Sequence, residues 1–208
     1  MSTKNKILDA AEQLFADKGF NGTSLREITS LAEVNLAAVN YHFGSKKELI
    51  KAVMSRYMNE LSPKLESVLI QICQQEQQPT LNEVFSAFIE PLLSLNVFKE
   101  NGTSNFLQLL GRGYTDSQGF LRWFLTTQYP GVISNFVAAV QKAYPELTAE
   151  DIFWRLHFTM GTVVFTMSST DALIDIAESD FEKKMDIAGV IRRVIPFVAA
   201  GVAAPIGD

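Results

Sequence analysis

Apolar residues recur at the spacing of the α-helix along almost the whole chain, and the alternating pattern of a β-strand is almost absent. In the first such segment, the apolar residues that share one face are Ile7, Leu8, Ala11, Leu14 and Phe15. Gly19 follows as a C-terminal stop, which predicts a helix over about residues 4–18. Because this periodicity continues through the chain, we expect an all-α fold.

Capping residues divide the next segment into short helices. Ser24 and Glu27 have the spacing of a capping box, in which each side chain bonds a backbone N–H at the start of a helix. Asn35 is a suitable N-cap for a third helix, and Ser45 with Glu48 repeats the capping box before a long fourth helix. The residues that this helix carries inward are Leu49, Ile50, Val53, Tyr57 and Leu61. The sequence thus predicts a small N-terminal domain over residues 1–47, joined by the long helix to a second domain over residues 48–208.

The second domain is also predicted to be helical. Thr80 caps a helix that Pro91 kinks, residues 117–144 form one helix or two joined near Pro130, and a further helix opens after Thr148. The last helix places on one face Ile187, Val190, Ile191, Val194, Val198 and Val202.

Charge is distributed unevenly between the two parts. The net charge is -5, yet residues 1–60 hold eight Lys/Arg against seven Asp/Glu, while the remainder holds ten against sixteen. A neutral-to-basic end on an acidic body would direct that end toward a polyanion. Neither a signal peptide nor an apolar run long enough to span a bilayer is recognised, so we expect a soluble, cytoplasmic protein without a membrane partner.

Residues that could carry catalysis are few. Cys73 is the single cysteine, and His42 and His157 are the only histidines, so no zinc cluster can be assembled from Cys and His. No Ser-His-acid set, catalytic carboxylate pair or phosphate-binding glycine loop can be placed. The sequence therefore predicts a protein that is not an enzyme and has no catalytic residues, metal or cofactor.

Residues 24–42 have the arrangement of a helix-turn-helix, whose second helix lies in the DNA major groove. Ala37 and Ala38 are small enough to approach the floor of the groove, and Asn40 is suited to a bidentate contact with adenine. Residues at the helix ends would meet phosphates. The residues expected to contact DNA are Thr23, Ser24, Arg26, Asn35, Leu36, Ala37, Ala38, Asn40, Tyr41, His42 and Lys46.

The run from Ile28 to Leu49 resembles the helix-turn-helix of the TetR family of bacterial transcriptional regulators. The matching motifs are Val34 in the turn, Ala37-Ala38, Tyr41-His42-Phe43 and Ser45-Lys46-Lys47-Glu48-Leu49. Glu33 departs from the family pattern, which usually has Gly in the turn. A left-handed backbone there would cost Glu roughly 1 kcal/mol against Gly, so we expect a slightly remodelled turn.

The resemblance implies a homodimeric, ligand-responsive repressor that binds a palindromic operator in double-stranded DNA. In such a fold the last helix and the helix over about 149–169 form a four-helix bundle with a second subunit. The residues then expected at the dimer interface are Phe153, Met160, Val164, Ile187, Val190, Ile191, Val194, Val198 and Val202. The alternative role of the last helix is to pack on its own body.

Three segments, "NLAAVNYHFGSKK", "SQGFLR" and "FWRLHFTMG", resemble the PsrA-like branch of the family, which implies an apolar effector such as a long-chain fatty acid or acyl-CoA. The fifteen Phe and two Trp fit an apolar effector site with a few polar groups. The residues expected to line it are Phe88, Phe106, Leu110, Trp123, Phe136, Trp154, Arg155, His157 and Phe158.

Other interpretations of these residues stay open. Aromatic residues at helical spacing are more often core than pocket, and His157 is more often a hydrogen-bonded core histidine than a ligand contact. Two other functions also fit the composition: a regulator of the efflux type that responds to other aromatic compounds, and a helical lipid carrier without a DNA role.

Overall fold

The computed structural model describes residues 1–116 and 118–205, and these residues form helices without any strand, which confirms the predicted all-α class. The N-terminal lobe consists of α1 (Thr3–Lys18), α2 (Leu25–Leu31) and α3 (Leu36–Phe43), and α4 (Lys46–Gln74) leads out of it. The second lobe contains α5 (Leu81–Ser86), α6 (Ile89–Leu93), α7 (Leu95–Phe98), α8 (Gly102–Asp116), α9 (Gln118–Gln128), α10 (Pro130–Ala143), α11 (Ala149–Ser168), α12 (Thr170–Phe181) and α13 (Ile187–Ala203).

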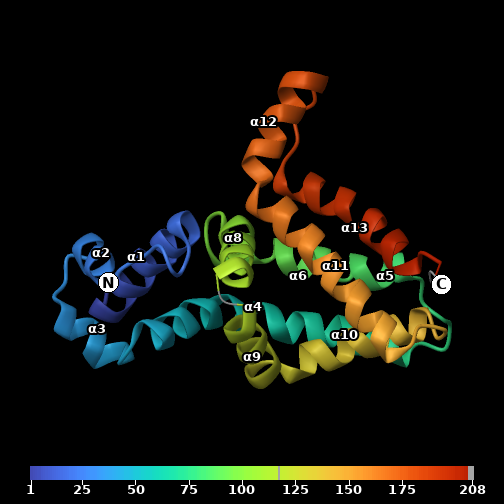
Figure 1. Ribbon diagram of the computed structural model, residues 1–208, viewed down its shortest axis with the longest axis horizontal. Helices are drawn as coiled ribbons and strands as arrows, with labels where there is room; N and C mark the ends of the chain where they lie inside the picture. The colour runs from blue at the N-terminus through green and yellow to red at the C-terminus, as the bar shows by residue number, and fades with distance from the viewer. Residues whose placement is uncertain (117, 206–208) are drawn as a thin grey trace.

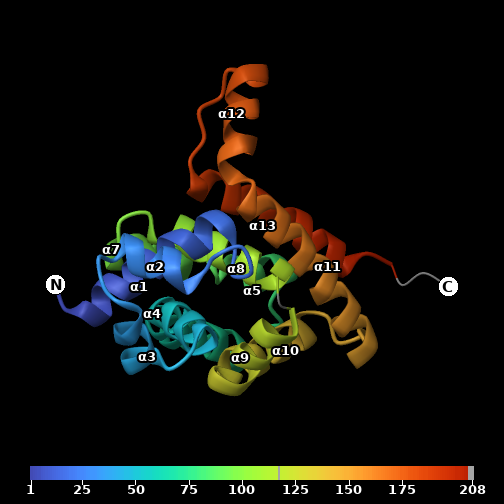
Figure 2. The ribbon, with the colours of Figure 1, turned by 60° about the vertical axis from the view of Figure 1, so that its left-hand side comes forward.

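The N-terminal lobe lies at one end of the molecule, and α4 runs from it into the second lobe (Figure 1). Within the second lobe α10 packs along α4, α11 packs on α8 and α13, and α13 also packs on α5. Helix α12 projects from this body in both views (Figures 1 and 2). In the described part of the chain, no helix combines the length and the apolar character needed to cross a membrane.

Local capping bonds start the helices where the sequence predicted them. Ser24 and Glu27 form the full capping box, and the Asn35 side chain accepts from the Ala38 N–H at 2.9 Å. Ser45 accepts from the Glu48 N–H at 3.2 Å, but the Glu48 carboxylate bonds the Lys51 ammonium at 2.7 Å. Ser45 is therefore an N-cap as expected, whereas the reciprocal half of the second predicted box is replaced by an ion pair.

The turn between α2 and α3 keeps the left-handed backbone despite its glutamate. Glu33 has φ +53°, and the Val34 N–H closes the turn by donating to the Thr29 carbonyl at 3.0 Å. The expected remodelling of the turn is therefore not observed. The strain stays on Glu33, because a Cβ is unfavourable in this region of φ.

We expect Glu33→Gly to raise the free energy of unfolding by up to about 1 kcal/mol, since Gly removes the left-handed penalty but loses more chain entropy on folding. Urea unfolding followed by circular dichroism measures the change. Glu33→Ala is the matched control, because it removes the exposed carboxylate and keeps the Cβ. An equal gain from Glu33→Ala would assign the effect to charge and contradict the backbone argument.

Two prolines shape the second lobe, and the effect of Pro91 differs from the prediction. The helix after Thr80 breaks at Ala87 and Phe88 instead of kinking at Pro91. Pro91 has no N–H, and its ring would clash with the carbonyl of residue 87, four positions earlier, so the break falls there. Pro130 occupies the first position of α10, which separates it from α9. Residues 117–144 thus contain two helices, with Ser117 outside the described residues. Helix α12 was not predicted.

Candidate nucleic-acid interface

Helix α3 is held to the N-terminal lobe by one face and exposes the other. Val39 and Phe43 are buried in the core. On the opposite face Ala37 and Asn40 are exposed, and Tyr41 is 85% exposed. A helix about 10–12 Å across fits a major groove about 12 Å wide only if its outward side chains are small. The position of Ala37 on this face meets that condition.

The start of α2 is fixed by a compact polar cluster. Glu27 accepts from the Lys18 ammonium at 2.7 Å and from the Ser24 N–H at 2.7 Å. These bonds, first that of Lys18 and then those of Ser24, lower the pKa of Glu27 to about 2. Its carboxylate therefore stays charged and holds the cap at any ordinary pH. Ser24 and Arg26 are exposed at this helix start, as expected for phosphate contacts.

Thr23 corrects the predicted set of DNA contacts. Its side chain is 1% exposed, and its hydroxyl donates to the carbonyls of Leu14 at 3.0 Å and Gly19 at 2.8 Å. The hydroxyl thus ties the α1–α2 turn together and is not available to a phosphate. Sequence reasoning missed this because a threonine before a capping box has the same pattern whether it points outward or inward.

The remaining predicted contacts lie around the ends of α3. Leu36 is 43% exposed, Ala38 and His42 are half-buried, and the rings of Tyr41 and His42 meet edge to face at 5.1 Å. Asn35 uses its side-chain oxygen for the cap, which leaves its amide nitrogen for an outside partner. Lys46 is half-buried at the first position of α4.

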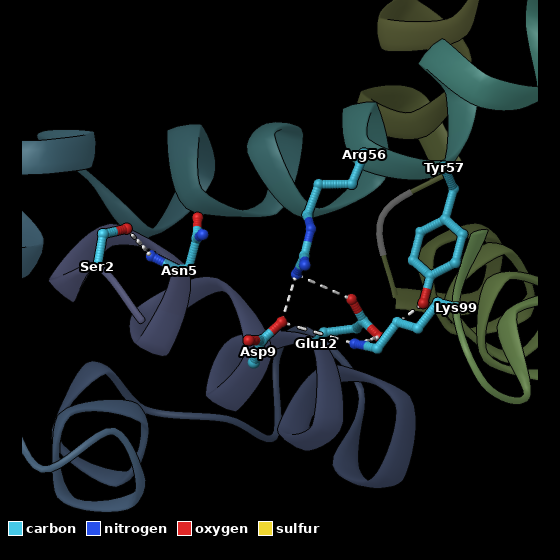
Figure 3. Close-up of polar contacts among 7 residues, drawn as sticks. All are labelled: Ser2, Asn5, Asp9, Glu12, Arg56, Tyr57 and Lys99. Carbon is cyan, nitrogen blue, oxygen red and sulfur yellow. Dashed lines mark hydrogen bonds and ion pairs between the residues drawn. The ribbon is translucent and has the colours of Figure 1, made fainter.

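A buried polar network joins the N-terminal lobe to the second lobe (Figure 3). Glu12 of α1 is 3% exposed, and its Oε1 accepts from the Tyr57 hydroxyl at 2.6 Å and the Lys99 ammonium at 2.5 Å. Its Oε2 accepts from Arg56 at 3.2 Å, and Arg56 also bonds Asp9 at 2.7 Å. The network links α1 to α4 and to the segment after α7. Sequence analysis did not single out Glu12, although its position four residues from both Leu8 and Ala16 placed it on the apolar face.

Tyr57 connects this network to the core of the second lobe. Its side chain is fully buried, and its ring lies 5.9 Å from Phe98 and 5.6 Å from Phe106. Burial, followed by the bond to Glu12, raises the pKa of Tyr57 well above its usual range. The phenol therefore stays protonated and remains a donor to Glu12.

Helix α8 makes a second connection at the far end of α1. Arg112 donates to the carbonyls of Ala16 at 3.4 Å and Asp17 at 3.2 Å, where the last α1 carbonyls need donors. Asp116 accepts from the Asn21 N–H at 3.1 Å, and its carbonyl accepts from the Asn21 amide at 3.1 Å. The end of α8 is thereby tied to the α1–α2 turn.

Helix α9 makes a third connection, to the first turns of α4. The Lys51 ammonium lies 4.8 Å from the Trp123 ring centroid, and the Lys47 ammonium lies 5.2 Å from that of Phe120. Such cation–π contacts are worth about 0.5–1 kcal/mol at exposed sites. Movement of α8 or α9 would therefore act directly on the helices that carry α3.

The residues predicted to line an effector site are not gathered in one place. Phe136 packs with Phe88 at 5.0 Å between ring centroids, while Phe106 is buried against Tyr57, and Leu110 is partly buried. The others lie at the surface, where Trp123 is 45%, Trp154 49% and Phe158 66% exposed. The surface position of these three corrects their predicted place in an apolar effector site.

Arg155 and His157 are both engaged by backbone. Arg155 donates to the carbonyls of Val202 at 2.5 Å and Ala204 at 2.6 Å, so it caps the end of α13 and does not face a ligand. His157 bonds the Phe153 carbonyl of its own helix at 2.6 Å through Nδ1. Both placements favour structural roles over the predicted contact with an effector.

Two of the surface hollows in the described part of the chain have linings that contain none of the predicted effector residues. One of about 190 Å³ lies at the junction of α1 and α8, against Asp17 and Arg112. The other, about 520 Å³ and open, has this lining: Thr126, Pro130, Ile133, Ser134, Val137, Ala138 and Gln141. Among the described residues, no group of three His, Cys, Asp or Glu side chains is placed to hold a metal ion.

The predicted dimer residues divide into buried and accessible ones. Val190, Ile191, Val198 and Val202 are at most 8% exposed because α13 packs this face on α5 and α11. This corrects their predicted role, since their own body already covers them. Phe153 is 40% exposed, and the half-buried members of the set are Met160, Val164, Ile187 and Val194.

Other aromatic side chains stand outward from the same two helices. Trp154, Phe158 and Phe165 follow one another at helical spacing along α11, with the last two 66% and 65% exposed. On α13, Phe197 is 67% exposed. Adjacent exposed aromatic residues of this size are typical of surfaces that another protein covers.

The chain matches two family models of known proteins. Residues 7–53 match that of bacterial regulatory proteins, tetR family, and residues 86–201 match that of the tetracyclin repressor-like C-terminal domain.

Similar proteins align with part of the chain. The probable HTH-type transcriptional regulator YttP of Bacillus subtilis (strain 168) is 41% identical over 81 residues, which are 39% of this chain and 39% of YttP. The negative regulator IcaR of the icaADBC biofilm operon of Staphylococcus aureus (strain Newman) is 44% identical over 46 residues, which are 22% of this chain and 25% of IcaR. The chain thus spans less than half the length of either relative.

Solved structures align over nearly the whole chain. A TetR-like transcriptional regulator from Rhodococcus sp. RHA1 has a TM-score of 0.58 at 16% identity, covering 98% of this chain and 97% of its own. SmeT, the repressor of the Stenotrophomonas maltophilia multidrug efflux pump SmeDEF, has a TM-score of 0.56 at 17% identity, covering 98% and 90%. At such identities the likeness establishes the fold alone.

Proposed function

Because the chain belongs to the TetR family of bacterial regulatory proteins, we propose that it is a cytoplasmic transcriptional repressor that binds a palindromic operator as a homodimer. The observation that carries the proposal is α3, which buries Val39 and Phe43 and turns Ala37, Asn40 and Tyr41 outward. Each subunit inserts α3 into the major groove of one half-site, and the two half-sites lie about 34–36 Å apart or a multiple of it.

The outward residues have separate tasks in this complex. Ala37 and Ala38 let the helix approach the base edges, and Asn40 pairs with an adenine. Tyr41 and Lys46, at the end of α3 and the start of α4, meet phosphates, as do Ser24 and Arg26 at the start of α2.

We expect Tyr41→Ala and Lys46→Ala to weaken binding to every DNA sequence, whereas Asn40→Ala mainly relaxes sequence preference. Loss of a phosphate contact removes affinity that does not depend on sequence, and loss of a bidentate base contact removes about 1–3 kcal/mol of discrimination. Titrations against an operator and a scrambled duplex at two salt concentrations separate the two effects. Unchanged binding by the first two variants would contradict the docking geometry.

The homodimer is proposed to form through the exposed aromatic residues of α11 and α13. Trp154, Phe158 and Phe197 are between 49% and 67% exposed and lie on two adjacent helices. Two-fold symmetry pairs the same patch on both subunits and presents two copies of α3 to the two halves of a palindrome.

An apolar effector is proposed to release the DNA, and a long-chain fatty acid or acyl-CoA is the candidate. The resemblance of three segments to the PsrA-like branch supports it, as does the cluster of Phe85, Phe88 and Phe136 between α5, α6 and α10. Binding among these rings would move α10, which packs along α4 and on α9. The contacts of α9 with the start of α4 would then change the spacing of the two α3 helices. A coupling of about 1–3 kcal/mol suffices for such a response.

The test is fluorescence anisotropy of the full chain with labelled DNA from its own upstream region, with and without oleic acid and oleoyl-CoA. Specific binding released by either lipid supports the proposal. Specific binding that ignores both lipids keeps the regulator and removes the fatty acid, and a panel of planar aromatic compounds then tests a regulator of the efflux type. Lipid binding without any preference for a DNA sequence would instead indicate a carrier.

A further inference from the structure

Helix α12 stands off the body of the molecule. Figures 1 and 2 show it projecting beyond the ends of α11 and α13 that support it. Of its twelve residues, eight are exposed: Asp171, Ala172, Asp175, Ile176, Glu178, Ser179, Asp180 and Phe181. A lone helix of about 12–15 residues or fewer is marginal in water. Such a projection therefore gains most of its stability from something that packs on it.

The apolar residues of α12 are only partly used within the chain. Ile174 is partly buried and packs against the core at the base of the helix. Ile176 is 55% exposed, and Phe181 at the tip is 68% exposed. Full burial of such a side chain is worth about 1.5–3 kcal/mol, so these two residues offer contact area to a partner.

The charged residues of α12 are all acidic. The helix contains Asp171, Asp175, Glu178 and Asp180 and neither Lys nor Arg. Within the described part of the chain, its one ion pair joins Glu178 to Lys184 at 3.8 Å, with the two side chains 48% and 90% exposed. This charge repels DNA and fatty-acid carboxylates, and it favours a basic protein surface.

A surface of that kind is present on α13 of the same chain. Arg192 is 58% exposed and has one long contact, 3.8 Å to the exposed Glu90. Arg193 is exposed and forms no ion pair within the described part of the chain. Phe197 follows Arg193 by one helical turn and is 67% exposed. An acidic helix with apolar residues is complementary to this combination of two arginines and an aromatic ring.

We propose that residues 170–186 form an arm that docks on α13 of a second copy of this chain. Ile176 and Phe181 of the arm pack near Phe197 of the second copy, and the carboxylates of the arm pair with its Arg192 and Arg193. The inference rests on the proposed homodimer and adds α12 to its interface, beside the Phe197 end of the aromatic patch on α11 and α13. In a two-fold dimer the contact occurs twice, so both arms hold the pair.

Sedimentation equilibrium of the full chain tests the arm. We expect Phe181→Ser to weaken dimerisation by about tenfold or more, as for a buried aromatic anchor. Val97→Ser is the matched control, because Val97 is 91% exposed on α7 and its loss leaves the dimer unchanged. The charge contact is tested by Glu178→Arg and Arg192→Glu, each weakening the dimer alone and restoring it when both are combined in one chain.

The outcomes separate the arm from the proposed function. Unchanged dimerisation of Phe181→Ser and Glu178→Arg, or a wild-type chain that stays monomeric, overturns the arm. Operator binding is measured on the same samples and tests the proposed regulator independently of the arm. A wild-type dimer that depends on the arm but ignores operator DNA supports the arm and overturns the proposed regulator. A dimer that binds the operator and is unchanged by every arm variant supports the proposed regulator and overturns the arm.

Discussion

Glu12→Ala is expected to lower the free energy of unfolding by about 3 kcal/mol, because removing one partner of a buried charge pair typically costs about 3–5 kcal/mol and the cations here are partly exposed. The variant leaves the Tyr57 hydroxyl without its acceptor and removes one carboxylate contact each from Arg56 and Lys99. Arg56 and Lys99 retain 24% and 30% exposure and can bind water, which places the expected loss at the lower end of that range.

The same network contains its own control. Asp9 shares Arg56 and Lys99 with Glu12, but its side chain is 33% exposed. Asp9→Ala should therefore cost no more than about 1 kcal/mol, as for an exposed pair. Urea unfolding of both variants, followed by circular dichroism, measures the difference. Equal losses from the two substitutions would show that the burial of Glu12 does not set the strength of this polar network.

The position of Glu12 explains why the buried polar network matters for regulation. Glu12 belongs to the lobe that carries α3, Tyr57 to the long helix, and Lys99 to the second lobe. Arg112 and Asp116 fix the other end of α1 to α8. The N-terminal lobe is thus held at two places along α1, so a shift of α8 would tilt the lobe instead of bending α4 alone.

Local bonds made much of the fold predictable from sequence. Ser24, Asn35, Thr80 and Thr148 each begin a helix by accepting a backbone N–H three residues on, so a short pattern contains the whole interaction. The inward face of α4 was predictable for a similar reason, because a helix needs only its own spacing to define an apolar side.

What lies opposite an apolar face was not predictable. Val190, Ile191, Val198 and Val202 form one side of α13, and the sequence cannot distinguish a face that packs on its own body from one that packs on a second subunit. Thr23 and Glu12 were missed because their partners are distant carbonyls or side chains. Helix α12 was missed because it is short and no side chain caps its start at Ser169, although Leu173, Ile174 and Ala177 share one side.

The largest effect on DNA binding is expected from Ala37→Glu, which should weaken operator binding by about a hundredfold or more. If α3 lies in the groove, the new carboxylate is placed against base edges and between phosphates without a partner. An uncompensated charge in such a position costs about 3–5 kcal/mol, and each 1.4 kcal/mol is tenfold in affinity. Anisotropy with operator DNA at fixed salt measures the loss.

Folding is not expected to account for that loss. Ala37 is exposed and occupies the second position of α3, where an acidic side chain interacts favourably with the helix dipole. The variant should thus unfold at the same urea concentration as the wild type or slightly higher. Ala149→Glu adds the same charge to an exposed first turn in the second lobe and should leave DNA binding intact. If Ala37→Glu binds DNA like the wild type, α3 does not lie in the major groove, and another surface of the same fold must contact the DNA.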